Sequence, residues 1–426
     1  MTSSAPARTA IDIASAVRSA AIDPVAPTRA ALSRIAQSDG ELNAFTWVDD
    51  ESALADAKSL ESRPNLSELP MAGVPVAIKD NIDADHPVVT RLKAAGAVVV
   101  GYTALPECGI WPMTDNPERV TRNPWKPELS AGGSSGGAAA AVASGMVPVA
   151  HGNDGLGSIR IPAAVCGIFG LKPGAGVVPS EVGRTSWGGM VENGVLSSTV
   201  ADAALALSVM AADPSLAVLS NPARLRIALD VSLPPMAMVR GDRHWRAAAR
   251  VAGSVAVSAG HYVESAALPY PSMNATVIRW CAAAAKDAQG QKLRGLERRN
   301  RTHIRLGRLA NALHLEGVST ANLEAAVAPF FERYELVITP ALARNAPKAK
   351  HFSRTGWISN AWACRYAPLM GMWNILGWPA ASVPMGRHPD GSPMAVQIAG
   401  PPGSESTILG LAAQIESRHP WPVVAF

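Results

Sequence analysis

The sequence is poor in cysteine and in charged residues. Its 426 residues include four cysteines, and no two of them form a C-x-x-C pair. We therefore expect neither a disulfide framework nor a zinc site, and a reducing compartment fits this usage. Only 17% of the residues are charged, and 38 basic against 34 acidic residues give a net charge of +4. Over this length the excess is too small to indicate nucleic-acid or membrane partners.

Long apolar runs are also missing. No uninterrupted stretch could span a bilayer, and the N-terminus lacks the basic segment and apolar core of a secretory signal. We therefore expect a soluble, cytoplasmic protein. Hydrophobic residues still make up 48% of the chain, which indicates a folded protein with a large core.

The apolar segments alternate between helical and strand-like patterns. Helical periodicity dominates residues 10–62, and short apolar strands alternate with helices from 71 to 171, which is typical of an α/β sheet. Pro75 should lie at an edge or at the start of its strand, because proline cannot donate a ladder hydrogen bond. Residues 111–129, rich in proline and asparagine, should form an ordered loop across the glycine turns described below. Residues 357–371 should form one helix.

No repeat or low-complexity linker marks a domain boundary. We therefore predict one large domain over residues 1–426, although this length is long for a compact unit. Its core should comprise about 71–210 and 357–426, with a variable helical section at about 211–330.

Two glycine-rich turns carry serine residues. Residues 132–137 read Gly-Gly-Ser-Ser-Gly-Gly and lead into an alanine-rich helix, and residues 152–158 read Gly-Asn-Asp-Gly-Leu-Gly-Ser. Glycine lets backbone N–H groups approach a reacting atom because no Cβ blocks them. One helix and one strand separate the two turns, so the turns can meet at one point. This is the construction expected of an oxyanion hole beside a nucleophile.

A lysine belongs to the same pattern. Lys79 lies in Val-Ala-Ile-Lys-Asp-Asn, and Ser134 and Ser158 lie in the two glycine turns. Together these contexts closely resemble the amidase signature family. The resemblance runs from about residue 71 to 199 and resumes over 373–404. It implies a mixed β-sheet sandwiched between α-helices, and hydrolysis of a carboxylic amide or also of an ester.

The resemblance also implies a catalytic role for each of these residues. Ser158 would attack the amide carbonyl and form an acyl-enzyme. Ser134, in a cis peptide with its predecessor, would relay the proton from Ser158 to Lys79. Lys79 can act as a base only if burial depresses its pKa enough to keep the amine neutral near pH 7. Neither a metal nor an organic cofactor is implied. The oxyanion hole would consist of the N–H groups of Gly155, Leu156, Gly157 and Ser158.

The sequence departs from the family pattern at two places. The family commonly has Asp-Thr-Gly-Gly-Ser at the nucleophile turn, where this chain has Leu156 and an extra side chain. That side chain could restrict the backbone or form a wall of the acyl pocket. The segment between Asn81 and the helix at Val88 is shorter than in relatives. Either a loop beside the site has been lost, or a piece of it is absent from the sequence.

Apolar side chains near these motifs are candidates for the substrate pocket, although such residues also form protein cores. They would favour an apolar or aromatic acyl amide. The predicted substrate-binding residues are Trp111, Met113 and Trp373, with Leu156, Trp357, Trp362 and Met370 as further candidates.

Four other features receive a structural interpretation. Asp154 and Arg160 should brace the nucleophile turn through an ion pair. His151 lies on the preceding strand without an identifiable acidic partner, so we expect a packed or surface histidine. Cys166 should be a small buried hydrophobic residue. The basic run 292–308 should form a solvated helix face because no aromatic residues interleave with it.

Three other functions remain open at this point. The chain could be the amidase subunit of a tRNA-dependent glutamine amidotransferase, or a catalytically weak amidase-like binding protein. A phosphate-binding glycine loop ranks last because the turn at 132–137 lacks the G-x-x-x-x-G-K-[ST] arrangement. The predicted partner is a small-molecule amide, and the sequence leaves a homodimer open.

Overall fold

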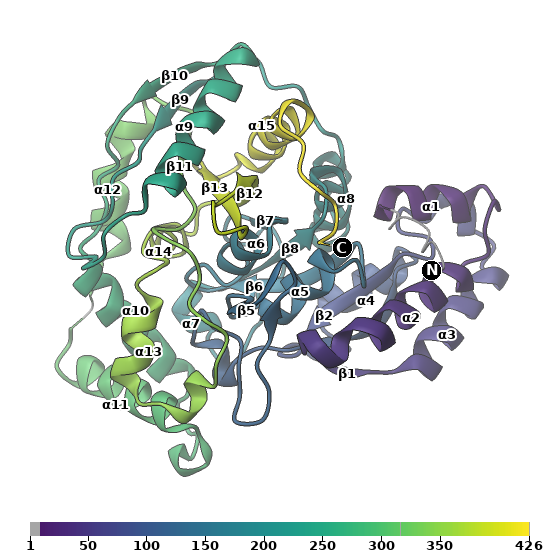
Figure 1. Cartoon of the computed structure of the whole chain (residues 1–426), viewed down its shortest axis with the longest axis horizontal. Helices are drawn as coiled ribbons and strands as arrows, with labels where there is room; N and C mark the ends of the chain where they lie inside the picture. Colours follow the sequence, from purple (N-terminus) through teal and green to yellow (C-terminus); the bar gives the residue numbers. More distant parts are fainter. Residues whose placement is uncertain (1–8, 316, 426) are drawn as a thin grey trace.

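The computed structural model describes residues 9–315 and 317–425, and Figure 1 shows their arrangement. This part of the chain forms an eleven-stranded sheet and a separate two-stranded one. In spatial order the large sheet contains β1 (Phe45–Val48), β3 (Val98–Thr103), β2 (Pro75–Lys79), β6 (Val149–Asp154), β8 (Glu192–Ser197), β7 (Phe169–Lys172), β12 (Ala380–Arg387), β13 (Pro393–Ala399), β11 (Leu336–Pro340), β9 (Arg226–Leu229) and β10 (Tyr262–Ser265).

Fifteen α-helices in the described residues surround these strands. They are α1 (Ala10–Arg18), α2 (Val25–Leu42), α3 (Asp50–Ser59), α4 (Pro87–Ala94), α5 (Gly136–Ala143), α6 (Arg160–Cys166), α7 (Ser186–Gly189), α8 (Val200–Ala211), α9 (Arg243–Ser258), α10 (Met273–Asp287), α11 (Arg298–Ala312), α12 (Thr320–Phe331), α13 (Trp357–Cys364), α14 (Gly371–Leu376) and α15 (Glu405–Arg418).

The sheet combines parallel and antiparallel pairs. β2 is parallel to β3 and β6, whereas β6, β8, β7, β12 and β13 pair antiparallel in succession. In Figure 1 the helices α1 to α3 lie at one end of the molecule, and β9, β10 and α12 lie at the other. The mixed sheet and its helical layers confirm the predicted fold class.

Residue chemistry explains how the central strands and α5 fit together. Pro75 is the first residue of β2, so it occupies a strand start although β2 lies inside the sheet. Every residue of α5 is glycine, alanine or valine and is buried. A Cβ at Gly137 would lie 2.4 Å from the backbone nitrogen of Ala104, so only glycine permits this close approach.

Two local predictions need correction. Residues 111–129 do lie against the first glycine turn, since a Cβ at Gly133 would meet the backbone of Trp111 at 2.8 Å. However, this segment is not all loop, because it contains β4 (Arg122–Asn123) and most of β5 (Lys126–Ser130). The single helix predicted over 357–371 is divided into α13 and α14, and Pro368 lies in the break. Proline lacks the N–H that a continuous helix would need there.

The section predicted as variable and helical also supplies strands. β9 and β10 lie within residues 211–330 and extend the large sheet beyond β11. This continuity supports one large domain, which stays a prediction. In the described residues, no helix combines the length and apolarity needed to cross a membrane.

Candidate active site

Lys79 ends β2, between β3 and β6, and its side chain is fully buried. Burial lowers the pKa of this amine to about 7, because a charged ammonium loses its hydration there, while the nearby Asp154 carboxylate partly opposes the shift. At pH 7 the Lys79 amine is therefore neutral in a substantial fraction of the protein molecules. An ordinary surface lysine would be almost wholly charged.

The contacts of Lys79 orient the lone pair of its amine. Lys79 Nζ lies 2.8 Å from Oγ of Ser134, 2.7 Å from Oδ1 of Asn153 and 3.3 Å from the Asn153 carbonyl oxygen. A neutral amine has two N–H donors and one lone pair. The two Asn153 oxygens can accept both N–H groups, which leaves the lone pair to accept the Ser134 hydroxyl proton.

Asn153 is itself held by a second amide. Its Nδ2 donates to Oδ1 of Asn81 at 2.8 Å, and Nδ2 of Asn81 donates back to Oδ1 of Asn153 at 3.3 Å. Asn81 lies two residues beyond Lys79, so both sides of this pair come from the motifs that carry the predicted site. This pair was not predicted from the sequence, where its only signal is that the two asparagines lie within those motifs.

The structure brings the two glycine turns together. The Gly133–Ser134 peptide is cis, as the resemblance implied, and Ser134 lines the same cavity as Ser158. The N–H of Ser135 donates to the carbonyl of Ser158 at 3.0 Å, which joins one turn to the other. Both serines predicted to take part in the chemistry therefore face one cavity, and one of them contacts Lys79.

The backbone N–H groups in and just after the nucleophile turn, residues 152–158, have two different roles. The Asp154 carboxylate accepts hydrogen bonds from the N–H groups of Gly157, Ile159 and Arg160 and so caps the start of α6. The Gly157 N–H is therefore committed to the turn, which corrects its predicted place in the oxyanion hole. Gly157 also has φ +117°, and a Cβ there would lie 2.7 Å from that of Met370.

The remaining predicted donors face the cavity. Gly155, Leu156 and Ser158 all line it. Within the described residues, no protein acceptor takes the N–H groups of these three positions. They are thus available to a bound oxyanion. Leu156 does not need left-handed backbone, so its side chain changes the pocket wall rather than the turn.

A buried ion pair braces this turn, as predicted. The Arg160 guanidinium contacts Asp154 through Nε to Oδ2 at 2.9 Å and Nη2 to Oδ1 at 3.0 Å, and both side chains are fully buried. Burial alone would raise the pKa of Asp154, but the charge and hydrogen bonds of Arg160 hold it well below its usual range. Arg160 also donates to Asn374 at 2.6 Å and to Gln397 at 2.7 Å. The turn is thereby fixed to α14 and β13.

The cavity has a volume of about 340 Å³ and is mainly apolar. Among the described residues that line it, Arg365 is the one charged side chain, and its guanidinium stacks on Trp362 at 3.6 Å from the ring centroid. The walls come from the loop before α9, from α10 and from α13, as well as from the two turns. The tryptophans of the wall are Trp187, Trp280, Trp357 and Trp362.

The predicted wall residues divide into two groups. Leu156, Trp357 and Trp362 line the cavity, as expected. The substrate-binding prediction is wrong for three others, because their side chains are buried and do not line the cavity: Trp111, Met113 and Trp373. Trp111 packs edge-to-face against Trp280, with centroids 5.4 Å apart, so it supports the wall from behind. The further candidate Met370 also lies outside the lining.

Two other side chains behave as predicted. His151 is buried. Its Nδ1 accepts a hydrogen bond from the backbone N–H of Lys79, and its Nε2 contacts Asn193 Oδ1 at 2.9 Å. Burial lowers the pKa of His151 to about 3, so it is a neutral packed histidine. Cys166 is also buried, and burial raises the pKa of its thiol.

The basic run differs from its prediction at one arginine. Arg298 and Arg305 are exposed, but Arg299 is fully buried. Its guanidinium contacts Asp115 at 2.9 Å and Glu297 at 2.6 Å. An isolated helical pattern could not reveal the contact with Asp115, because Asp115 lies far away in the sequence.

A protein-family model described as Amidase matches residues 26–87 and 83–409. The two matched stretches meet at the short connection between β2 and α4, where the sequence predicted a missing loop. The AmiB2 protein of Mycobacterium tuberculosis, named as an amidase, is 37% identical over 422 residues, covering 92% of this chain and 91% of that protein. A Synechocystis relative, also named as an amidase, is 34% identical and covers 96% of this chain and 88% of that protein.

Solved structures show the same similarity. A 6-aminohexanoate cyclic dimer hydrolase complexed with substrate has a TM-score of 0.83 at 28% identity, covering 97% of both chains. A bacterial aryl acylamidase has a TM-score of 0.79 at 26% identity, with 97% of both chains covered. The A subunit of Glutamyl-tRNA(Gln) amidotransferase from Thermotoga maritima has a TM-score of 0.75 at 24% identity, which shows a shared fold.

Proposed function

Since the chain belongs to the amidase signature family and is an amide-cleaving hydrolase, we propose that Ser158, Ser134 and Lys79 carry out its reaction. One observation supports this assignment above the others. A buried amine with a depressed pKa contacts a serine hydroxyl in the cavity that also contains the second serine. This arrangement supplies both a base and a path for a proton.

Acylation would proceed through two linked proton transfers. Lys79 Nζ, 2.8 Å from Ser134 Oγ, would accept the proton of that hydroxyl while the Ser134 oxygen takes the proton of Ser158 Oγ. The second transfer requires the Ser158 hydroxyl to turn toward Ser134, because no hydrogen bond joins the two hydroxyls in the described residues. The Ser158 oxygen then forms a bond to the amide carbon, and the negative charge develops on the former carbonyl oxygen. The N–H groups of Gly155, Leu156 and Ser158 would stabilise this charge. Mutational precedents give about 3–4 kcal/mol for one such donor.

Collapse of this intermediate breaks the carbon–nitrogen bond. The proton held by Lys79 returns through Ser134 to the leaving amine, which departs neutral. Water then attacks the acyl-enzyme, its proton takes the same path back, and Ser158 is released with the carboxylic acid. These steps require only the chain's own groups and water.

For the substrate, we propose an amide with an apolar or aromatic acyl group. Tryptophan and methionine side chains form much of the wall, and its one charged side chain among the described residues stacks on Trp362. Glutamine would bring both an ammonium and a carboxylate into this cavity. The lining therefore favours an apolar amide over the glutamine of an amidotransferase subunit. The similarity to an aryl acylamidase agrees with this choice.

Fluorophosphonate labelling tests the nucleophile. The probe should label the wild-type protein and should fail to label Ser158→Ala, which should also lose amide hydrolysis. Ser144→Ala is the matched control, because Ser144 is buried at the end of α5 and its Oγ bonds only local helix carbonyls. Label or hydrolysis that persists in Ser158→Ala would refute the assignment. An unlabelled wild type without amidase activity would favour the amidase-like binding protein.

We also propose a cytoplasmic location. All four cysteines are free: Cys108, Cys166, Cys281 and Cys364. Because no two of these thiols form a disulfide, they suit a reducing compartment. The homodimer stays a prediction.

A further inference from the structure

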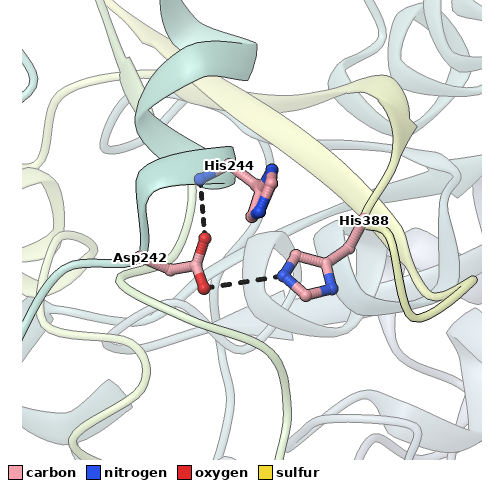
Figure 2. A group of neighbouring side chains, drawn as sticks. All are labelled: Asp242, His244 and His388. Carbon is pink, nitrogen blue, oxygen red and sulfur yellow. Dashed lines mark hydrogen bonds and ion pairs between the residues drawn. The ribbon is translucent and has the colours of Figure 1, made fainter.

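A second cluster of polar side chains lies outside the amidase cavity. Asp242 is the N-cap residue of α9, His244 lies in the first turn of that helix, and His388 follows β12 (Figure 2). The three side chains are half-buried, and their possible donor atoms all lie within 4.8 Å of one another. We propose that this cluster binds a divalent transition-metal ion, with zinc as the preferred ion.

The donor atoms nearly match a zinc site. Oδ2 of Asp242 lies 3.5 Å from Nε2 of His388. Tetrahedral zinc with ligand bonds of about 2.0–2.2 Å separates neighbouring ligand atoms by roughly 3.4 Å. Two ligands are therefore already spaced to share one ion. The rings of His244 and His388 meet edge-to-face with centroids 5.0 Å apart, so His244 would have to rotate toward the ion to become the third ligand.

The far side of His388 is arranged as it is in metal sites. Its Nδ1 lies 3.1 Å from Oδ1 of Asp390, and that carboxylate is held by Asn345 Nδ2 at 2.9 Å and by Ser392 Oγ at 2.6 Å. Histidine ligands commonly donate their second N–H to a carboxylate, which fixes the ring and its tautomer. In that tautomer Nε2 has a free lone pair 3.5 Å from the Asp242 carboxylate, and a cation could lie between the two atoms. Without a metal, Nδ1 can instead accept hydrogen bonds from Nδ2 of Asn345 at 3.0 Å and from the N–H of Asp390 at 3.3 Å, so metal binding would move the ring proton from Nε2 to Nδ1.

The surrounding charges are compatible with such an ion. Asp242 and Asp390 supply two negative charges. Two positive side chains lie nearby: Lys126 is 3.5 Å from Asp390, and Nε of Arg243 is 3.2 Å from Nε2 of His244. Arg243 is exposed and free to turn into solvent. Imidazole ligands favour zinc and its neighbours over calcium or magnesium. The partial exposure of the cluster leaves room for water as a fourth ligand.

Metal binding here would fix one end of a wall of the amidase cavity. The loop from β9 to α9 ends at Asp242, and Met236 and Met238 of this loop line the cavity. A metal ion would join the end of that loop to the turn between β12 and β13. This consequence for substrate binding rests on the proposed function, whereas the binding of the metal does not.

Zinc binding to the whole protein tests the proposal. After removal of metal with a chelator, calorimetric titration should show one equivalent of Zn²⁺ bound and a raised melting temperature, and Co²⁺ should give the absorption of a tetrahedral complex. His388→Ala and His244→Ala should each lose this binding. Asp390→Asn should weaken it by about 10–100-fold. Asp242 is left unchanged because it caps α9.

Two controls make the outcome decisive. His314→Ala removes an exposed histidine at the end of α11 and should bind zinc like the wild type. Ser158→Ala should also bind normally, so failure of the proposed catalytic role would leave this test intact. Absence of stoichiometric binding in the wild type would overturn the proposal and leave a proton between His388 and Asp242. Binding that survives in both histidine variants would overturn it equally.

Discussion

Asn153 accepts a hydrogen bond from the Lys79 amine at 2.7 Å, and this contact sets the direction of the amine's lone pair. A buried neutral lysine is a useful base only if its lone pair faces the group that must lose a proton. Asn153 occupies the other directions with its two oxygens, and the pairing with Asn81 prevents its side-chain amide from turning freely. The pair of asparagines therefore positions the base.

The pH dependence of hydrolysis should report the ionisation of Lys79. Its pKa is about 7 in the folded protein, so the amine is protonated and inactive as a base at lower pH. We expect kcat/KM to rise with pH through an apparent pKa near 7 and then level off. A pH–rate profile with an apolar anilide measures this. A rate independent of pH between 5.5 and 8.5, about one to two units either side of that pKa, would contradict it.

Removing the amine should separate catalysis from stability. Lys79→Met should lose most of its activity at neutral pH but keep its fold. The lysine is less easily protonated when folded than when unfolded, so it lowers stability most below pH 7, and that loss shrinks as pH rises toward 10.5. The variant should therefore gain the most stability relative to the wild type at low pH. Melting curves at pH 6 and 9 check this, and collapse of the fold would make Lys79 structural.

Asn153→Asp should move the pH profile without removing the contact. A carboxylate in place of the amide would lie next to Nζ of Lys79 and favour its charged form. Opposite charges at such a distance shift a pKa by roughly 1–3 units. We expect the rising limb of kcat/KM to move to higher pH, with activity recovering there. Asn153→Ala is the comparison, since it should lower activity without this upward shift. A merely structural role would leave the apparent pKa unchanged.

Arg160 should be essential for stability. Arg160→Met leaves the buried carboxylate of Asp154 without its partner, and breaking such a pair costs about 3–5 kcal/mol. Urea denaturation measures the free energy of unfolding. Arg333→Leu is the control because its pair with Glu264 is largely exposed, with 71% and 59% of the side chains accessible. That variant should change stability little. Equal effects of the two substitutions would contradict the bracing role.

Trp362 should select for aromatic acyl groups. Trp362→Ala removes an exposed ring at the cavity, where it stacks on Arg365, and should scarcely affect the fold. We expect KM for an aryl amide to rise about 10-fold, since burying an aromatic surface contributes on the order of 1–2 kcal/mol. Acetamide, as a small substrate, should be hydrolysed almost unchanged. The same change in KM for both substrates would exclude a role in selectivity.

Local patterns in the sequence predicted much of the fold and the centre of the site. The serine-bearing turns and Lys79 could be recognised because glycine-rich backbone and a lysine at a strand end are visible in short segments. Trp111 and Trp373 were predicted wrongly, because the sequence near a motif looks the same whether an aromatic residue lines the cavity or belongs to the core. The prediction also failed for Arg299, whose carboxylate partner at Asp115 is far away in sequence.

The sequence by itself determined the α/β class and the family resemblance, since these depend on periodicity and on short motifs. Only the tertiary structure decided which hydrogen-bonding and charged groups contact one another. Asp154 takes the N–H of Gly157, Asn153 aims the amine of Lys79, and His388 comes to Asp242 across more than a hundred residues. Hydrogen bonds and charge pairs act over a few ångströms in space, and separation along the chain does not reveal them.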